Sequence, residues 1–102
     1  AWYDENGSPL GVRTHVDTSA ARFQATPWYM AHVIGERYYN SQLIVSQDAV
    51  TEATPSGFTF RVHLGASFSE GMPDGLVNSL SGNVSDDSDD LSWYVVWMGI
   101  EV

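Results

Sequence analysis

The segment Glu36-Arg37-Tyr38-Tyr39-Asn40 gathers more binding chemistry than any other stretch of the chain. An arginine donates two parallel hydrogen bonds, an amide both donates and accepts, and a carboxylate accepts. Aromatic rings offer a flat apolar face on which a sugar ring can stack. A loop with this composition is typical of carbohydrate binding, so the sequence predicts glycan contacts from Glu36, Arg37, Tyr38, Tyr39 and Asn40. The alternative is that these residues cover the edge of the core or form a subunit contact, where aromatic and arginine side chains are also enriched.

Arg61 and His63 are two residues apart and therefore share the polar face of one predicted strand. Together they are suited to bind a carboxylate or a sugar hydroxyl, and Trp28 is predicted to add a stacking ring to the same site. The chain has three histidines, in separate segments and without the spacing of metal ligands. We therefore expect histidines that belong to strands rather than a zinc site.

A run of carboxylates near the C-terminal end offers the hard oxygen ligands that suit Ca²⁺. The run lacks the spacing and the following glycine of an EF-hand loop, so a solvated acidic loop is the alternative. The candidate calcium ligands are Asp86, Asp87, Asp89 and Asp90, and no other cofactor is expected. Just before them, Asn83-Val84-Ser85 is an N-glycosylation sequon, which makes Asn83 a candidate acceptor in a secreted eukaryotic protein.

Motifs of catalysis are missing from the chain. It contains no Gly-x-Ser-x-Gly sequence, no cysteine nucleophile and no glycine-rich loop for phosphate. None of its carboxylates lies in a strand pattern that would bury it and raise its pKa for acid–base work. The sequence predicts a binding or structural protein rather than an enzyme.

The charge balance excludes two classes of partner. Thirteen acidic residues face four arginines and no lysine, which gives a formal net charge of −9. This charge repels phosphate backbones and anionic lipids, so we expect neither nucleic acid nor a membrane surface as a partner. No segment approaches the roughly 20 apolar residues that a membrane helix needs, so no membrane insertion is expected either. A length of 102 residues, of which 43% are hydrophobic, predicts one domain over 1–102 with a single core.

The elements that must position these residues are predicted to be strands. Thirteen aromatic residues, nine glycines and few strong helix formers favour an all-β protein. Apolar or alternating runs bounded by glycine and proline predict strands over 11–17, 28–34 and 58–64. In the last of these, Phe58, Phe60, Val62 and Leu64 are expected to face inward. Turn residues at 53–57 and 72–75 and a short strand or helical turn near 76–80 complete an antiparallel β-sandwich of about six strands.

The final segment, 92–102, is apolar on both faces. A strand alternates its side chains, so Trp93, Val95 and Trp97 face one way and Tyr94, Val96, Met98 and Ile100 face the other. A strand without a polar face must be covered on both sides, and we expect a neighbouring subunit on one of them. The predicted interface consists of Trp93, Val95 and Trp97 with Trp2 and Tyr3. The last two are aromatic residues of segment 1–10, which we expect to anchor in another subunit by strand addition.

Four segments in sequence order resemble the landmarks of the H-type lectin-like β-sandwich: VDTSAARF, TPWYMAHVIG, ATPSGFTFRV and WYVVWMGIE. Modules of that family occur in extracellular proteins and at the tips of phage tail fibres. The resemblance covers most of residues 16–102. It implies a six-stranded sandwich that forms trimers, sometimes hexamers, and that binds terminal galactose-type sugars between subunits. The long acidic segment before Ser92 departs from the family pattern, so no sugar specificity is carried over.

These observations predict a non-catalytic, trimer-forming, lectin-like module that works outside the cell or on a virion and binds glycans at a shallow site between subunits. The alternative is a structural subunit of an extracellular fibre or filament, joined through segment 1–10 and the sandwich surfaces. The two differ in how they assemble: a lectin stops at a closed trimer or hexamer, whereas a fibre subunit keeps growing.

Overall fold

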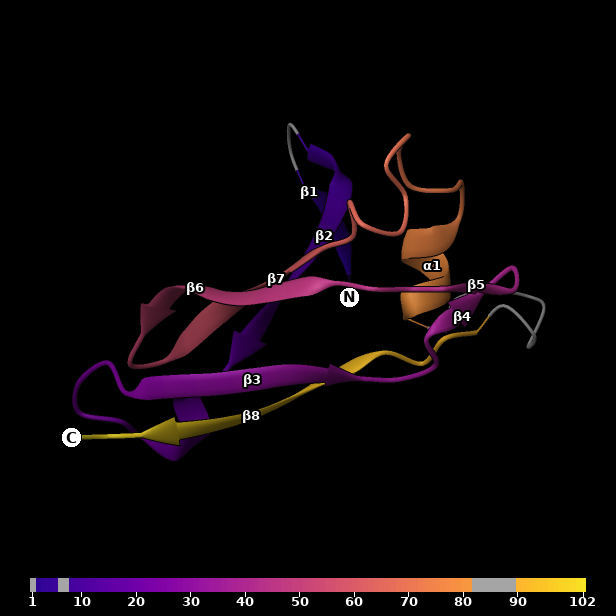
Figure 1. The fold of residues 1–102 in the computed structure, drawn as a ribbon. Helices are drawn as coiled ribbons and strands as arrows, with labels where there is room; N and C mark the ends of the chain where they lie inside the picture. Colours follow the sequence, from indigo (N-terminus) through magenta and orange to yellow (C-terminus); the bar gives the residue numbers. More distant parts are fainter. Residues whose placement is uncertain (1, 6–7, 82–89) are drawn as a thin grey trace.

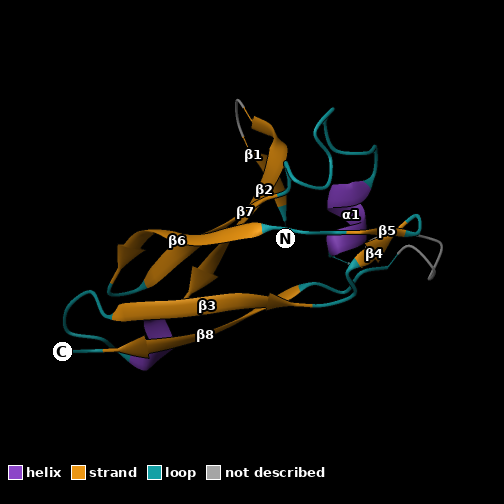
Figure 2. Ribbon diagram, in the orientation of Figure 1, coloured by secondary structure: helices purple, strands orange, loops and turns teal. Residues whose placement is uncertain are grey.

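The structure, a computed structural model, describes residues 2–5, 8–81 and 90–102. Within these ranges the chain forms eight strands, one 3₁₀ helix and one α-helix, and every strand pairing is antiparallel (Figures 1 and 2). The strands are β1 (Tyr3–Glu5), β2 (Ser8–Asp17), β3 (Trp28–Ile34), β4 (Tyr38–Tyr39), β5 (Gln42–Leu43), β6 (Gln47–Thr54), β7 (Gly57–His63) and β8 (Tyr94–Ile100). The helices are η1 (Ser19–Ala21) and α1 (Leu76–Leu80), and no described helix is long and apolar enough to cross a membrane. The predicted all-β class is confirmed.

Four strands form one sheet in the order β1-β2-β7-β6. The β2–β7 pairing runs without interruption from Gly11 opposite His63 to Asp17 opposite Gly57. β6 and β7 form a hairpin across the two residues 55–56, at the predicted turn. This sheet has one face toward the core and one toward solvent.

The other long strands, β3 and β8, form a two-stranded ribbon that lies over one face of the sheet (Figure 1). Their register runs from Trp28 opposite Ile100 to Ile34 opposite Tyr94. The Tyr29 ring of β3 lies 4.6 Å from the Phe58 ring of β7, measured between centroids. This ring contact joins the ribbon to the sheet.

The core lies between the ribbon and the sheet and continues under α1. The predicted inward residues of β7, and Leu64 just after it, are fully or almost fully buried, as predicted, while Thr59 of the other face is buried as well, at 7% exposure. Leu76 and Leu80 of the predicted helical turn are also fully buried. The buried apolar residues are Trp2, Val12, Val33, Tyr39, Ile44, Phe58, Phe60, Val62, Leu64, Phe68, Leu76, Leu80, Leu91 and Trp93.

The N-terminal segment adds a strand to its own chain. β1 pairs with β2 of the same sheet, and the Trp2 ring is buried edge-on against Trp93, with centroids 6.0 Å apart. The Trp2 indole N–H donates to the backbone carbonyl of Trp93 at 3.3 Å. The strand addition expected of this segment thus occurs within the chain, and the Trp2 side chain is already occupied there.

Candidate functional site

The predicted glycan segment 36–40 is fastened to the start of β8. The Glu36 carboxylate accepts the backbone N–H groups of Arg37 and Tyr38 at 3.0 and 3.1 Å. The Glu36 carbonyl accepts the indole N–H of Trp93 at 2.6 Å. The Arg37 guanidinium lies 4.8 Å from the centroid of the Trp93 ring and donates to the Ser46 hydroxyl at 3.2 Å. The Arg37 guanidinium therefore already makes a cation–π contact and a hydrogen bond within the fold, and a ligand would have to share or replace them.

The rest of this segment is a tight hairpin. Asn40 and Ser41 both have positive φ, 51° and 64°, as the two-residue type I′ turn between β4 and β5 requires. Tyr39 is buried, and its hydroxyl donates to the carbonyl of Asp74 at 3.3 Å. Tyr38 is 57% exposed. Among the aromatic rings of the predicted segment, only that of Tyr38 is open to a ligand.

Arg61 lies at the centre of an ion-pair network on the solvent face of the four-stranded sheet. Its guanidinium pairs with Glu5 at 2.5 Å and with Glu52 at 3.4 Å, and it donates to the Thr51 hydroxyl at 2.9 Å. A hydrogen bond from the Thr59 hydroxyl, followed by the charge of Arg61, lowers the pKa of Glu52. Because this pKa is depressed in the folded state, the network stabilises the fold above the ordinary pKa of 4.5 and weakens as pH falls through the lowered value.

Next to this network is a hollow of about 200 Å³. Its lining residues are Glu5, Gly11, Arg61, Val62 and His63. The structure thus brings Arg61 and His63 together, as predicted, and adds Glu5, which sequence reasoning missed. Within one chain, Trp28 lies on the ribbon and segment 36–40 at the β4–β5 hairpin, both apart from the hollow beside Arg61 on the four-stranded sheet.

An extended apolar surface in the described part of the chain is the outer face of the β3–β8 ribbon, which we call the ribbon face. It consists of four cross-strand pairs: Trp28–Ile100, Met30–Met98, His32–Val96 and Ile34–Tyr94. Its large apolar residues are exposed by 38–74% of their surface: Trp28, Met30, Ile34, Tyr94, Met98 and Ile100. A fully exposed large side chain has a surface of about 200 Å², and these six are on average about half exposed. Together they therefore present roughly 600 Å² of apolar surface to solvent. That is the upper limit for an apolar patch on an ordinary monomer.

The residues predicted for the subunit interface belong to the opposite face of β8. Trp93 is buried, and Val95 is half-buried against the core. The Trp97 ring lies edge-on to Tyr29 and Phe58, with centroids 6.0 and 6.3 Å apart. The chain's own sheet covers most of this face, although Trp97 is still 37% exposed, and the larger apolar surface left for a neighbour is the ribbon face. Tyr3 of the predicted interface is 58% exposed at the edge of the four-stranded sheet.

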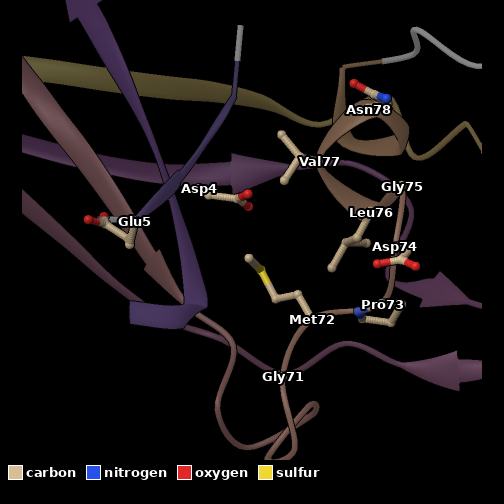
Figure 3. Close-up of a pocket in the computed structure, with 10 residues that line it drawn as sticks. All are labelled: Asp4, Glu5, Gly71, Met72, Pro73, Asp74, Gly75, Leu76, Val77 and Asn78. Carbon is tan, nitrogen blue, oxygen red and sulfur yellow. The ribbon is translucent and has the colours of Figure 1, made fainter. Parts of the chain in front are cut away.

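A larger cavity of about 560 Å³ lies between β1 and α1 (Figure 3). Met72, Leu76 and Val77 supply apolar walls, and the carboxylates of Asp4 and Asp74 stand at its border. Among the described residues no three histidine, cysteine or acidic side chains gather as metal ligands would. The cavity brings together neither metal ligands nor a nucleophile with a base.

Several predicted sites lie outside the described residues: the sequon asparagine Asn83 and the acidic residues Asp86, Asp87 and Asp89. Asp90 is described, and its carboxylate accepts the backbone N–H and the hydroxyl of Ser92, both at 2.8 Å. This contact orders the approach to β8. In comparisons of the chain with protein-family models, with curated proteins and with solved structures, nothing matches.

Proposed function

We propose that this protein is a non-catalytic structural module, a β-sandwich that assembles with copies of itself through the ribbon face. The observation that carries the proposal is one face of the ribbon on which every second cross-strand pair, four in all, turns outward without an acidic, arginine or lysine side chain. Leaving such a face in water costs about 25 cal/mol for each Å² of apolar surface. Covering it would therefore drive association.

A second copy of the chain is the partner that best suits this face. Two ribbon faces in contact would bury roughly 1,200 Å² in total, which reaches the size of a specific interface. The chain carries a formal charge of −9, and like-charged copies repel one another. The ribbon face has no carboxylate among its eight residues, so two copies can meet there without placing acidic groups in contact.

This proposal puts the fibre or filament function ahead of the lectin function. The predicted glycan residues are divided among three surfaces, and Arg37, Tyr39 and Arg61 already have partners within the fold. An extracellular fibre subunit accounts for the apolar face without requiring a ligand. The proposed assembly is either an open filament or a closed trimer such as the H-type lectin resemblance implies, and its mass distinguishes the two.

Met98→Glu should abolish association, because Met98 lies near the middle of the ribbon face and is 52% exposed. A carboxylate there would be buried in the assembled state on a face whose one ionisable side chain is that of His32, and burying a charge in this way is costly. Sedimentation velocity at micromolar to millimolar concentration should show growing mass for the wild type and monomer for the variant. Leu43→Glu is the matched control, since Leu43 is 49% exposed on the β4–β5 hairpin and away from this face. A wild-type chain that stays monomeric at all concentrations would refute the proposal.

Glycan binding is a second candidate, supported by the hollow beside Arg61 and His63. The hollow has a volume of about 200 Å³, whereas pockets for drug-sized ligands usually start at about 300 Å³. A hollow of this size suits a single sugar ring. Titration with methyl galactoside, followed by NMR, should shift the amide signals of residues 61–63, and His63→Ala should weaken binding several-fold. Unchanged spectra at high millimolar sugar would remove this candidate.

A further inference from the structure

We propose that two copies of this chain join through the free edge of β8, with the two β8 strands antiparallel, to form one sheet in the order β3-β8-β8-β3. The proposal rests on the proposed self-assembly and adds a second contact between copies, through a strand edge and in a stated register. This edge contact leaves the ribbon face open to pack against a further copy. The partner is a second copy of the chain. Figure 1 shows β8 along the border of the molecule, with β3 on one side of it, and no described strand pairs with its other edge.

The other sheet edges carry features that discourage strand addition. β1 has only three residues, two of them acidic. β6 carries Asp48 and a break in register, with Glu52 at a φ of 53°. β3 lies against β6, where the Tyr29 hydroxyl donates to the carbonyl of Thr54 at 2.7 Å. Short strands, charges, bulges and coverage are the usual protections of an edge.

β8 has none of these protections. Its seven residues, Tyr94 to Ile100, include no charged residue and no proline, and its register with β3 is regular. The nearest acidic side chain after it, Glu101, is held by its own chain, where it accepts the backbone N–H groups of Gln24 and Ala25 at 2.5 and 2.8 Å. An apolar edge of this kind, without charge, proline or bulge, is a template for another strand.

Pairing β8 with itself places residues of the same kind opposite one another. In the register centred on Trp97, Tyr94 of one copy lies opposite Ile100 of the other, and Val96 lies opposite Met98. Directly opposite residues of antiparallel strands share a face, so both ribbon faces merge into one apolar surface. Inward residues likewise meet only inward residues, and no like charges come together along the seven pairs. A two-fold contact of this type is self-complementary.

There is also room beside the first half of β8. A groove of about 370 Å³ separates it from the end of β2. Its lining includes Trp93, Tyr94 and Val95 on one side and Val16 and Asp17 on the other. β1 pairs with β2 only as far as Arg13, and no strand in the described part of the chain lies beside residues 15–17 of β2 on this side. In the proposed register the end of the partner's β8 would enter this groove.

The chain lacks cysteine, so introduced thiols report intermolecular contacts without interference. Tyr94→Cys and Ile100→Cys chains, mixed and oxidised, should give a disulfide-linked heterodimer, because opposite Cβ atoms are about 4.5–5.5 Å apart. Either variant oxidised alone should link far less, since its own thiols would be about 20 Å apart, six residues along a strand. The matched control is a mixture of Ile34→Cys and Trp28→Cys, on the same face but on the outer strands, about 14 Å apart in the proposed sheet.

The outcomes separate this proposal from the one on which it rests. Preferential linkage of the 94–100 mixture, by ten-fold or more over the control mixture, supports the β8–β8 edge. Equal linkage of both mixtures, in a wild-type chain that sediments as an assembly, overturns the edge contact and leaves face-to-face packing of the ribbon faces. A wild-type chain that sediments as a monomer overturns both.

Discussion

Phe58→Ala should lower the free energy of unfolding by about 3–5 kcal/mol, the usual cost of emptying a phenylalanine site in a core. Phe58 is fully buried, and its ring lies against Tyr29 and Trp97, so it joins the four-stranded sheet to the ribbon. A domain of this size has a total stability of about 5–15 kcal/mol. The substitution should therefore remove a large part of the stability and loosen the attachment of the ribbon.

Urea unfolding followed by tryptophan fluorescence measures this effect. The urea concentration at the midpoint should fall, while the slope of the unfolding free energy against urea should stay the same. The experiment is best done in the Met98→Glu background, because association would make the midpoint depend on concentration. Tyr38→Ala is the control, since an exposed aromatic residue without a core contact should change stability by no more than about 0.5 kcal/mol. A loss below about 1 kcal/mol for Phe58→Ala would show that the ribbon does not pack on the sheet through this ring.

Gly35→Ala should be of similar severity, with a cost of about 3–5 kcal/mol from overpacking together with backbone strain. Gly35 follows β3 and has a φ of 154°, and a Cβ there would lie 2.8 Å from the carbonyl oxygen of Leu91 and 2.9 Å from the Cα of Trp93. The backbone on both sides is fixed, because the N–H of Glu36 donates to the same Leu91 carbonyl at 2.9 Å. The added methyl group should push the Trp93 ring out of its site.

Gly71→Ala separates the effect of overpacking from the effect of backbone strain. Gly71 also has a positive φ, 113°, but nothing lies within 4 Å of the position of its Cβ. Its substitution should cost only the backbone strain, about 1–2 kcal/mol. Near-UV circular dichroism should report the displaced Trp93 in Gly35→Ala and remain unchanged in Gly71→Ala. Equal losses of stability in the two variants would mean that contact with Trp93 and Leu91 is not the cause.

Some elements could be read directly from local patterns. β3 has the predicted bounds, 28–34. They could be predicted because Pro27 directly precedes the apolar run and Gly35 directly follows it. The alternation in β7 was equally clear, since one face of that strand lies wholly in the core. β6 was not predicted, because an edge strand with most of its side chains in solvent lacks an apolar pattern. The burial of Trp2 depends on Trp93, which is 91 residues away, and no local pattern reports such a contact.

The sequence by itself determined that this protein is an antiparallel β protein and that its last strand is apolar on both faces. Only the tertiary structure decided which of those faces meets the chain's own core. Trp93, Val95 and Trp97 are no more hydrophobic as a set than Tyr94, Val96, Met98 and Ile100, so alternation cannot rank the two faces. The choice depends on the side on which the Phe58 strand lies, which is a contact between distant parts of the chain. The same contact leaves the other face to solvent, or to a second copy.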